Sequence, residues 1–273
     1  MSSSLHDVLA SLRLDRTGER TFVGEQLPAP FNHILGGHIS AQALLAAGLT
    51  APERRAHSAH TYFLRPGDAS RPVEFEVVPL QEGRTFSARR VTARQDGEVL
   101  LEAMASLKNA TADDVEYQPP MPEVAAPESL PAAPTHAAED AENGRGQWAS
   151  LRWFERRVVD AAAAPPAPAR IWWRPDGNLP EDPAVHTALV AYLSAVTLTE
   201  PAFAARGGLG PTAQRDHSVW FHRPPRLSDW MFYDQSSPSA VDRIALASGR
   251  MYNRSGELVC TVRQEMYFPP AKE

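Results

Sequence analysis

Two adjacent glycines open the stretch of this sequence that is best suited to bind a reacting oxygen. Gly36 and Gly37 are followed by His38 and then by a run of alanine and leucine that reaches about Gly48. If the glycines begin a helix, its first backbone N–H groups lack intrahelical acceptors and can bind an oxygen that carries negative charge. Glycine also has no Cβ atom, so a ligand could approach the backbone closely. The competing interpretation is that the pair only permits tight packing of the helix against a sheet.

The elements around this helix are predicted from the periodicity of the first half. Leu5, Val8, Leu9 and Leu12 share one face of a short N-terminal helix, and residues 21–26 form a strand candidate. From His57 onward the pattern changes to strands, in which apolar and polar residues alternate. The Asp96-Gly97 pair predicts a hairpin, because glycine supplies the positive φ that a tight turn needs.

The second half repeats this order of elements. A helix is predicted over residues 182–203, with Asp182 as N-cap, and strands follow up to the turn at residues 254–256. The Arg-Pro pairs at 65–66 and 223–224 are separated by 158 positions, and Gly97 and Gly256 by 159. Two elements with nearly the same offset indicate an internal duplication. Because each long helix is apolar nearly all round, a curved sheet must wrap around it.

The segment between the halves is rich in proline, alanine and acidic residues. It has too little apolar bulk to build a core, so we expect a linker or a loosely attached crossover, with a proline-rich docking motif as the alternative. The predicted division is an N-terminal repeat over residues 1–109, a linker over 110–147 and a C-terminal repeat over 148–273.

The composition excludes several classes of protein. The 273-residue chain has a formal net charge of −6, so no basic field favours nucleic acid or a membrane as partner. Cys260 is the only cysteine, which excludes an intrachain disulfide and indicates a reducing compartment. The N-terminus does not resemble a secretory signal, and no apolar window is long enough to span a bilayer. We therefore expect a cytoplasmic protein.

Motifs for other chemistries are missing from the sequence. It contains no Walker-type loop, no dinucleotide fingerprint and no His/Asp/Glu spacing typical of a metal site. It also lacks the G-x-S-x-G motif of a Ser-His-Asp hydrolase. We expect no cofactor and no metal ion.

Several short motifs together resemble one known family. The motifs are LGGH, HTYFLRPGD, EGRTFSARRV and QDG in the first half, with DHSVWFHRP and RQE in the second. They are similar to those of the bacterial type II acyl-CoA thioesterases, over about residues 5–108 and 150–268. The resemblance implies an α+β double hotdog fold, in which two tandem repeats each wrap an antiparallel sheet around a long central helix. It also implies an acyl-CoA substrate and a homo-oligomer.

The resemblance implies a catalytic Asp, Thr and Gln in the second half, and this chain keeps one of the three. The Gln falls on Gln264, the Asp on Ala195 and the Thr on Gln214. General-base catalysis contributes about 10²- to 10⁴-fold, and alanine cannot supply it. Gln214 can donate and accept hydrogen bonds, so we expect it and Gln264 to hold the attacking water. Gln214 could instead be a surface residue of a loop.

His38 is the replacement base that we would test first, because the unperturbed pKa of histidine lies closest to neutrality. Its alternative role is a polar residue at the helix start that contacts only backbone or solvent. The thioester carbonyl would then bind at Gly36 and at the N–H of Gly37, which can contribute about 2.7 to 4 kcal/mol per donor in acyl transfer.

Other residues are candidates for substrate contact. His60 and Tyr62 share one face of a strand and could line the acyl chain, although aromatic residues there are more often core. Arg89 and Arg90 could bind the phosphates of coenzyme A, or could be solvated or ion-paired strand residues. Ala195 would line the site in place of the family Asp.

Three functions remain open at this stage. The first is hydrolysis of acyl-CoA thioesters to free acid and CoA, in a site between the two repeats. The second is an acyl-thioester binding protein with little or no catalytic activity. The third is another hotdog enzyme, such as an enoyl-CoA hydratase, for which no motif is present.

Overall fold

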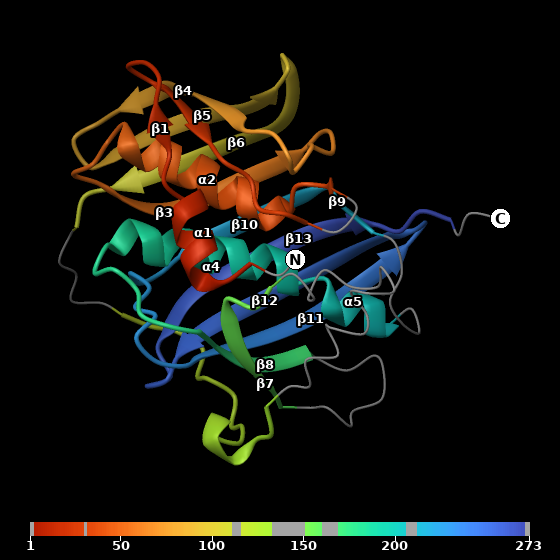
Figure 1. Cartoon of the computed structure of the whole chain (residues 1–273). Coiled ribbons are helices and arrows are strands. Elements are labelled where there is room, and N and C mark those ends of the chain that lie inside the picture. The colour runs from red at the N-terminus through yellow and green to blue at the C-terminus, as the bar shows by residue number, and fades with distance from the viewer. Residues whose placement is uncertain are drawn as a thin grey trace.

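The computed structural model describes residues 3–29, 32–110, 116–132, 151–159, 169–205 and 212–270. These residues form one curved antiparallel sheet that wraps around two long helices, α2 (Gly36–Leu49) and α4 (Pro183–Thr197), as Figure 1 shows. The shorter helices are α1 (Leu5–Ser11), η2 (Pro127–Ser129) and α5 (Glu200–Ala205). The strands are β1 (Asp15–Arg16), β2 (Thr21–Gly24), β3 (Arg55–Phe63), β4 (Val73–Glu82), β5 (Phe86–Gln95), β6 (Glu98–Lys108), β7 (Phe154–Val158), β8 (Ala169–Pro175), β9 (Ala213–Gln214), β10 (Asp216–Phe221), β11 (Met231–Val241), β12 (Ile244–Asn253) and β13 (Leu258–Tyr267).

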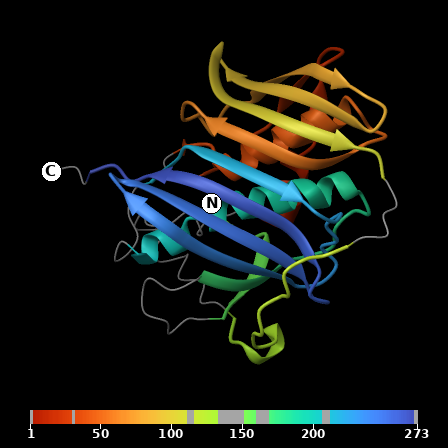
Figure 2. The same ribbon diagram turned by 180° about the vertical axis from the view of Figure 1, so that it is seen from behind.

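The strand order confirms the internal duplication. The first half runs β2-β4-β5-β6-β3 across the sheet and the second half runs β8-β11-β12-β13-β10. In both halves the long helix follows the first strand of this set. The halves join where β3 and β10 pair antiparallel, with Ala59 opposite Val219, and the sheet continues across this junction in Figure 2. The expected α+β double hotdog fold is confirmed.

Turn chemistry fixes the registers of the hairpins. Asp96 and Gly97 have φ angles of 53° and 81°, so the hairpin predicted between β5 and β6 is present. Gly256 has a φ of 86° and lies in the turn before β13. A third tight turn joins β11 to β12 through Asp242 and Arg243, which have φ angles of 49° and 64°. This turn was not predicted, because neither residue is glycine.

Capping residues set the helix starts. Ser4 and Asp7 form a reciprocal capping box on α1, and Asp182 accepts a hydrogen bond from the Ala184 N–H at the start of α4. The helix predicted over residues 182–203 is broken, because α4 ends at Thr197 and α5 begins at Glu200. Pro201 explains part of this break, since proline removes a helical N–H and clashes with the preceding turn.

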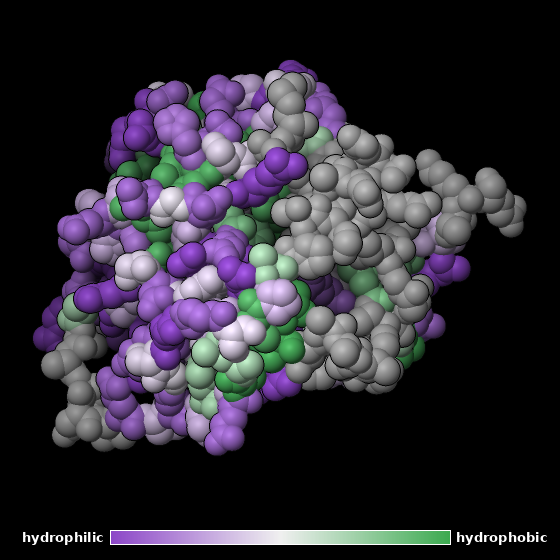
Figure 3. Space-filling model, turned by 60° about the horizontal axis from the view of Figure 1, so that its bottom comes forward, coloured by the Kyte–Doolittle hydropathy of each residue, from purple (hydrophilic) through white to green (hydrophobic). Residues whose placement is uncertain are grey.

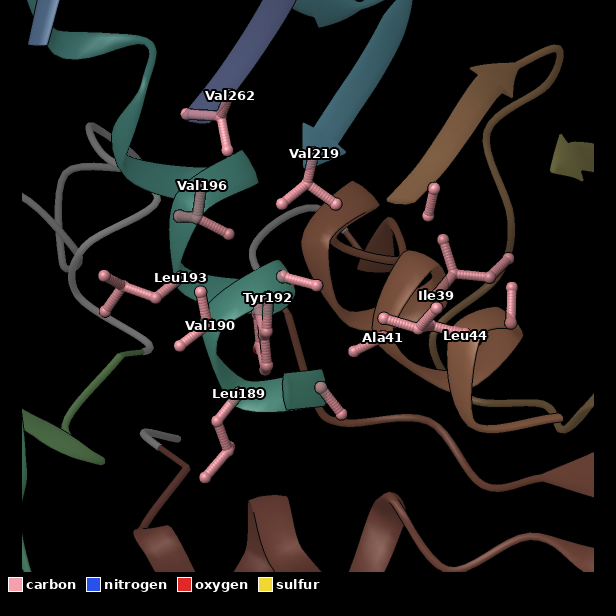
Figure 4. Close-up of a cluster of buried hydrophobic side chains, with 14 of the residues drawn as sticks. Ile39, Ala41, Leu44, Leu189, Val190, Tyr192, Leu193, Val196, Val219 and Val262 are labelled. Atoms are coloured by element: carbon pink, nitrogen blue, oxygen red, sulfur yellow. The ribbon is translucent and has the colours of Figure 1, made fainter. Parts of the chain in front are cut away.

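The core lies where the two long helices pack against each other and against the centre of the sheet. In Figure 4, Ala41 of α2 lies on the side toward Tyr192 of α4, and Ile39 and Leu44 lie on the other side of α2. Above them, Val219 of β10 and Val262 of β13 point toward the helices. All of these side chains are buried.

Part of the segment between the halves packs on the outer face of the second half. Trp172 Nε1 donates to Ala125 O at 2.9 Å, and Gln118 Oε1 accepts from Leu258 N at 2.9 Å. Residues 116–132 are therefore not loosely attached, and the rest of the predicted linker lies outside the described residues. The division into segments 1–109, 110–147 and 148–273 stays a prediction.

The surface is mixed in character. Among the coloured residues of the face in Figure 3, hydrophilic side chains predominate and apolar side chains gather in smaller groups. None of the helices in the described part of the chain is both long and apolar enough to cross a bilayer.

Candidate active site

The glycine pair begins α2, as the sequence predicts. Leu35 is the N-cap and offers no side-chain hydrogen bond to the first turn. The first N–H groups of a helix have no intrahelical acceptor, so those of Gly36 and Gly37 remain donors at this end of the helix. An incoming oxygen with negative charge would be stabilised here.

The two glycines have different neighbours. A Cβ atom on Gly37 would lie 2.9 Å from both Tyr192 Cδ2 and Val196 Cγ2, and closer still to the carbonyl oxygen of Tyr192. Gly37 therefore allows α2 to pack tightly on α4. A Cβ atom on Gly36 would overlap Gln214 Oε1 and lie 3.0 Å from Phe63 Cε1. Gly36 faces the candidate site, and the packing role that the sequence suggested concerns helix against helix rather than helix against sheet.

Gln214 links this helix start to α4. Its Oε1 lies over Gly36, and its Nε2 donates to the Ala195 carbonyl oxygen at 2.6 Å. The carbonyl of Ala195 belongs to the last turn of α4, where carbonyl groups lack intrahelical donors. Gln214 therefore caps α4 and covers Gly36 with a single side chain.

Gln264 lies on the same face of the sheet. Gln214 pairs with Met266 of β13, and Gln264 is two residues away on that strand, so both point to the inner face. Gln264 is fully buried, and neither its Oε1 nor its Nε2 has a hydrogen-bond partner among the described residues. A buried amide without a partner is rare in folded proteins and is often part of a functional site.

The C-terminal end of α4 has two further polar contacts that the sequence analysis missed. Ser194 Oγ lies 3.1 Å from His217 Nε2, and the Ser194 carbonyl accepts from Tyr233 Oη at 3.2 Å. Burial lowers the pKa of His217 to about 3, so its imidazole is neutral at pH 7. The period of two along the strands could have revealed both residues, because His217 shares the buried face of Val219 and Tyr233 shares that of Met231.

His38 does not join this cluster. Its Nε2 lies 2.9 Å from Ser11 Oγ and its Nδ1 lies 3.2 Å from Gln26 Oε1, so the ring faces α1 and the segment after β2. Burial lowers the pKa of His38 to about 3. Both ring nitrogens are engaged and the imidazole is a weak base, so His38 does not fit the expected base. It does not fit the alternative of backbone or solvent contacts alone either, because its partners are two side chains.

The arginines proposed for coenzyme A also lie elsewhere. Arg89 is buried and donates to Thr50 Oγ1 at 2.8 Å, with an ion pair to Glu82. Thr50 follows the C-terminal end of α2, about 20 Å along the helix from Gly36. Arg90 is exposed on the opposite face of β5, because neighbouring residues of a strand point to opposite faces. Neither arginine reaches the candidate site.

The strand face chosen for substrate contact is the outer one. Tyr62 is 61% exposed and His60 is also exposed, with its Nδ1 3.1 Å from Ser218 Oγ. The next residue along the strand, Phe63, points inward and lies against Gly36. Phe63 therefore replaces His60 and Tyr62 as the aromatic contact of this strand.

Comparison with known proteins identifies the family of this chain. Residues 27–108 match the family model "Acyl-CoA thioesterase N-terminal domain", and residues 163–267 match the model "Acyl-CoA thioesterase". Acyl-CoA thioesterase 2 of Haemophilus influenzae is 33% identical over 282 residues, which cover 97% of this chain and 98% of that protein. The chain belongs to the acyl-CoA thioesterase family.

Other members of the acyl-CoA thioesterase family are similar over nearly the whole chain. Acyl-coenzyme A thioesterase 8 of Homo sapiens is 30% identical and covers 94% of this chain, with 87% of that protein aligned. The solved tesB protein of Mycobacterium avium subs paratuberculosis is 64% identical, with a TM-score of 0.87 and coverage of 98% and 100%. The acyl-CoA thioesterase II TesB2 from Mycobacterium marinum is 34% identical, with a TM-score of 0.81 and coverage of 97% and 99%.

Proposed function

We propose that this chain binds acyl-CoA thioesters between α2 and β13 and hydrolyses them slowly. The carbonyl oxygen binds the free N–H groups of Gly36 and Gly37, and Gln264 holds the attacking water. The observation that carries this proposal is the buried, unpartnered amide of Gln264, on the inner face that also bears Gln214. A water molecule can satisfy both amide atoms, because it donates and accepts.

In the proposed reaction, the water oxygen adds to the carbonyl carbon and the oxygen that becomes negative is held at the helix start. The carbon–sulfur bond then breaks, and the proton lost by the water ends on the sulfur of CoA. Ala195 stands where relatives of this type are expected to carry an aspartate. Without that carboxylate the water has no strong proton acceptor, so the rate should be lower by about 10²- to 10⁴-fold.

A second candidate function is binding of acyl-CoA without cleavage. It is favoured by the position of Gln214, whose Oε1 lies over Gly36 and whose Nε2 is bound to Ala195 O. This side chain fills the space on the Cβ side of Gly36, so in this alternative it restricts the approach of a carbonyl oxygen to the helix start. Hydrolysis would then lack both a proton acceptor and an open position for the carbonyl.

Replacing Ala195 tests both candidates. We would follow the release of free CoA thiol from acyl-CoAs of several chain lengths, with the wild type, Ala195→Asp and Ala195→Asn. Ala195→Asp should raise the rate by about 10²- to 10⁴-fold, because it supplies the missing proton acceptor. Ala195→Asn is the matched control, since it has nearly the same shape and cannot act as a base.

The outcomes separate the possibilities. Slow release by the wild type above the buffer rate supports hydrolysis, whereas measurable binding without release supports the binding function. Equal rates for the Asp and Asn variants would show that the water does not lie beside residue 195. The absence of acyl-CoA binding in all three proteins would contradict both candidates.

We also propose that the protein acts in the cytoplasm as a homo-oligomer. The single cysteine, Cys260, is buried and its thiol pKa is raised to about 12 by burial, which suits a protein that forms no disulfide. The outer face of the sheet exposes Tyr62, Met104 and Trp220, and large apolar side chains on an outer face are a common feature of subunit contacts.

A further inference from the structure

Gln235 of β11 is a second buried amide without a partner. It is fully buried, and neither its Oε1 nor its Nε2 has a hydrogen-bond partner among the described residues. Two other buried glutamines behave differently: Gln42 Nε2 donates to two backbone carbonyls, and Gln95 Nε2 donates to three. Gln235 and Gln264 are thus the two buried glutamines of the described chain whose desolvation is not compensated.

The sheet places Gln235 near Gln264. Gln235 pairs with Gly249 of β12, and Gln264 pairs with Ala247 of the same strand from the other side. Both amides point to the inner face, and between them the ring of Tyr233 covers Gly249 of β12. With about 4.8 Å between strands and about 3.4 Å per residue, their Cα atoms lie about 12 Å apart.

Tyr233 connects the inner face of β11 and β12 to the candidate site. A Cβ atom on Gly249 would lie 2.9 Å from Tyr233 Cζ, so the ring of Tyr233 lies over that glycine. Its hydroxyl donates to the Ser194 carbonyl oxygen at 3.2 Å, next to Ala195. Gln235 lies on the same face of β11, two residues and about 7 Å along the strand from Tyr233, where β11 also contacts α5.

The chemistry of a primary amide indicates what would satisfy Gln235. An amide presents donors on Nε2 and acceptor positions on Oε1, and a hydroxyl group can accept from the first and donate to the second. A methylene group can do neither. We infer that this site takes acyl chains that carry a hydroxyl group, and that Gln235 binds that hydroxyl; this inference rests on the proposed function.

The spacing limits where the hydroxyl lies on the acyl chain. The thioester carbonyl binds beside Gln264, and about 12 Å separates the backbone positions of the two glutamines. A β-hydroxyl is only two carbon–carbon bonds from the carbonyl and does not cover that span. The favoured substrates carry the hydroxyl several carbons further along, near the middle of a medium-length chain.

Binding measurements test this assignment without requiring turnover. The probes are dodecanoyl-CoA, β-hydroxydodecanoyl-CoA and a dodecanoyl-CoA with a mid-chain hydroxyl, titrated into the wild type, Gln235→Leu and Ser236→Ala. Leucine is close to glutamine in size and cannot form a hydrogen bond. Ser236 is exposed on the opposite face of β11 and serves as the matched control.

The wild type and Ser236→Ala should bind the mid-chain hydroxyl probe about tenfold more tightly than dodecanoyl-CoA, and Gln235→Leu should lose this preference. The β-hydroxyl probe should gain little. Equal affinities for the plain and mid-chain probes in the wild type would overturn the inference, as would an unchanged preference in Gln235→Leu. The wild-type comparison decides the matter even if the leucine variant does not fold. If plain acyl-CoA binds and hydroxylation has no effect, only this inference fails; if no probe binds, the proposed function fails with it.

Discussion

The contact between Gly37 and α4 gives a sharp prediction about stability. A Cβ atom on Gly37 would lie 2.9 Å from Tyr192 Cδ2 and from Val196 Cγ2, and closer to the Tyr192 carbonyl oxygen. Atoms of a helix backbone cannot rotate away, so α2 and α4 must separate to admit a methyl group. Overpacking of this kind costs about 1 to 3 kcal/mol, which exceeds the gain of less than about 1 kcal/mol from placing alanine in a helix.

Gly48 provides the matched control in the same helix. A Cβ atom there meets nothing within 4 Å, so Gly48→Ala should stabilise the protein by roughly 0.5 to 1 kcal/mol. For a chain of this size, about 1 kcal/mol shifts the melting temperature by roughly 2 to 4 °C. With the helix gain subtracted from the overpacking cost, Gly37→Ala should melt below the wild type by up to about 10 °C, and Gly48→Ala slightly above it.

The assay is thermal unfolding followed by circular dichroism, with the free energy of unfolding from urea titration as a second measure. If Gly37→Ala proves as stable as Gly48→Ala, the helices are further apart than the structure has them. The assignment of Gly37 to helix packing would then be withdrawn.

Two further predictions concern residues that were expected in the candidate site and lie outside it. Burial lowers the pKa of His38 and His217 to about 3, compared with about 6.5 in the unfolded chain. As the pH falls, the unfolded state therefore takes up protons before the folded state does. The free energy of unfolding should fall as the pH drops from 6.5 toward 3. His38→Gln, which cannot be protonated, should show a shallower fall in urea titrations across this range, and identical pH profiles would contradict the buried neutral imidazole. Arg89→Met should lower the free energy of unfolding by about 1 to 3 kcal/mol, because it leaves the groups of Thr50 and Glu82 unpaired. The affinity for acyl-CoA should stay unchanged. A large loss of affinity in a stable variant would show that Arg89 does bind the phosphates of coenzyme A.

Local rules within the sequence predicted the repeated units of a long helix and a sheet, and the family resemblance implied the double hotdog fold. The Asp96-Gly97 turn, the Asp182 cap and the glycine pair at the start of α2 depend on backbone preferences that act over a few residues. The offset of 158 between the Arg-Pro pairs revealed the duplication, which the strand orders confirm. The Asp242-Arg243 turn escaped prediction, because non-glycine residues adopt positive φ only where the strands on either side impose it.

The candidate site was predictable only in part. The sequence identified Gln264, Gln214, Ala195 and the glycine pair through motifs, and the roles of these residues remain proposals. Gln235 was not singled out, because a glutamine within a strand reads like any solvated residue until its face is known.

The sequence by itself determined the family, the two repeats and the types of side chain available for chemistry, because these depend on short motifs and local periodicity. The tertiary structure alone decided which side chains meet. It turned His38 toward Ser11 and held Arg89 at the far end of α2. It also brought Gln214 over Gly36 and left Gln235 and Gln264 on the inner face without hydrogen-bond partners among the described residues. The reason is physical: the face that a side chain occupies follows from strand register and helix packing, and these are set by contacts between residues far apart in the chain.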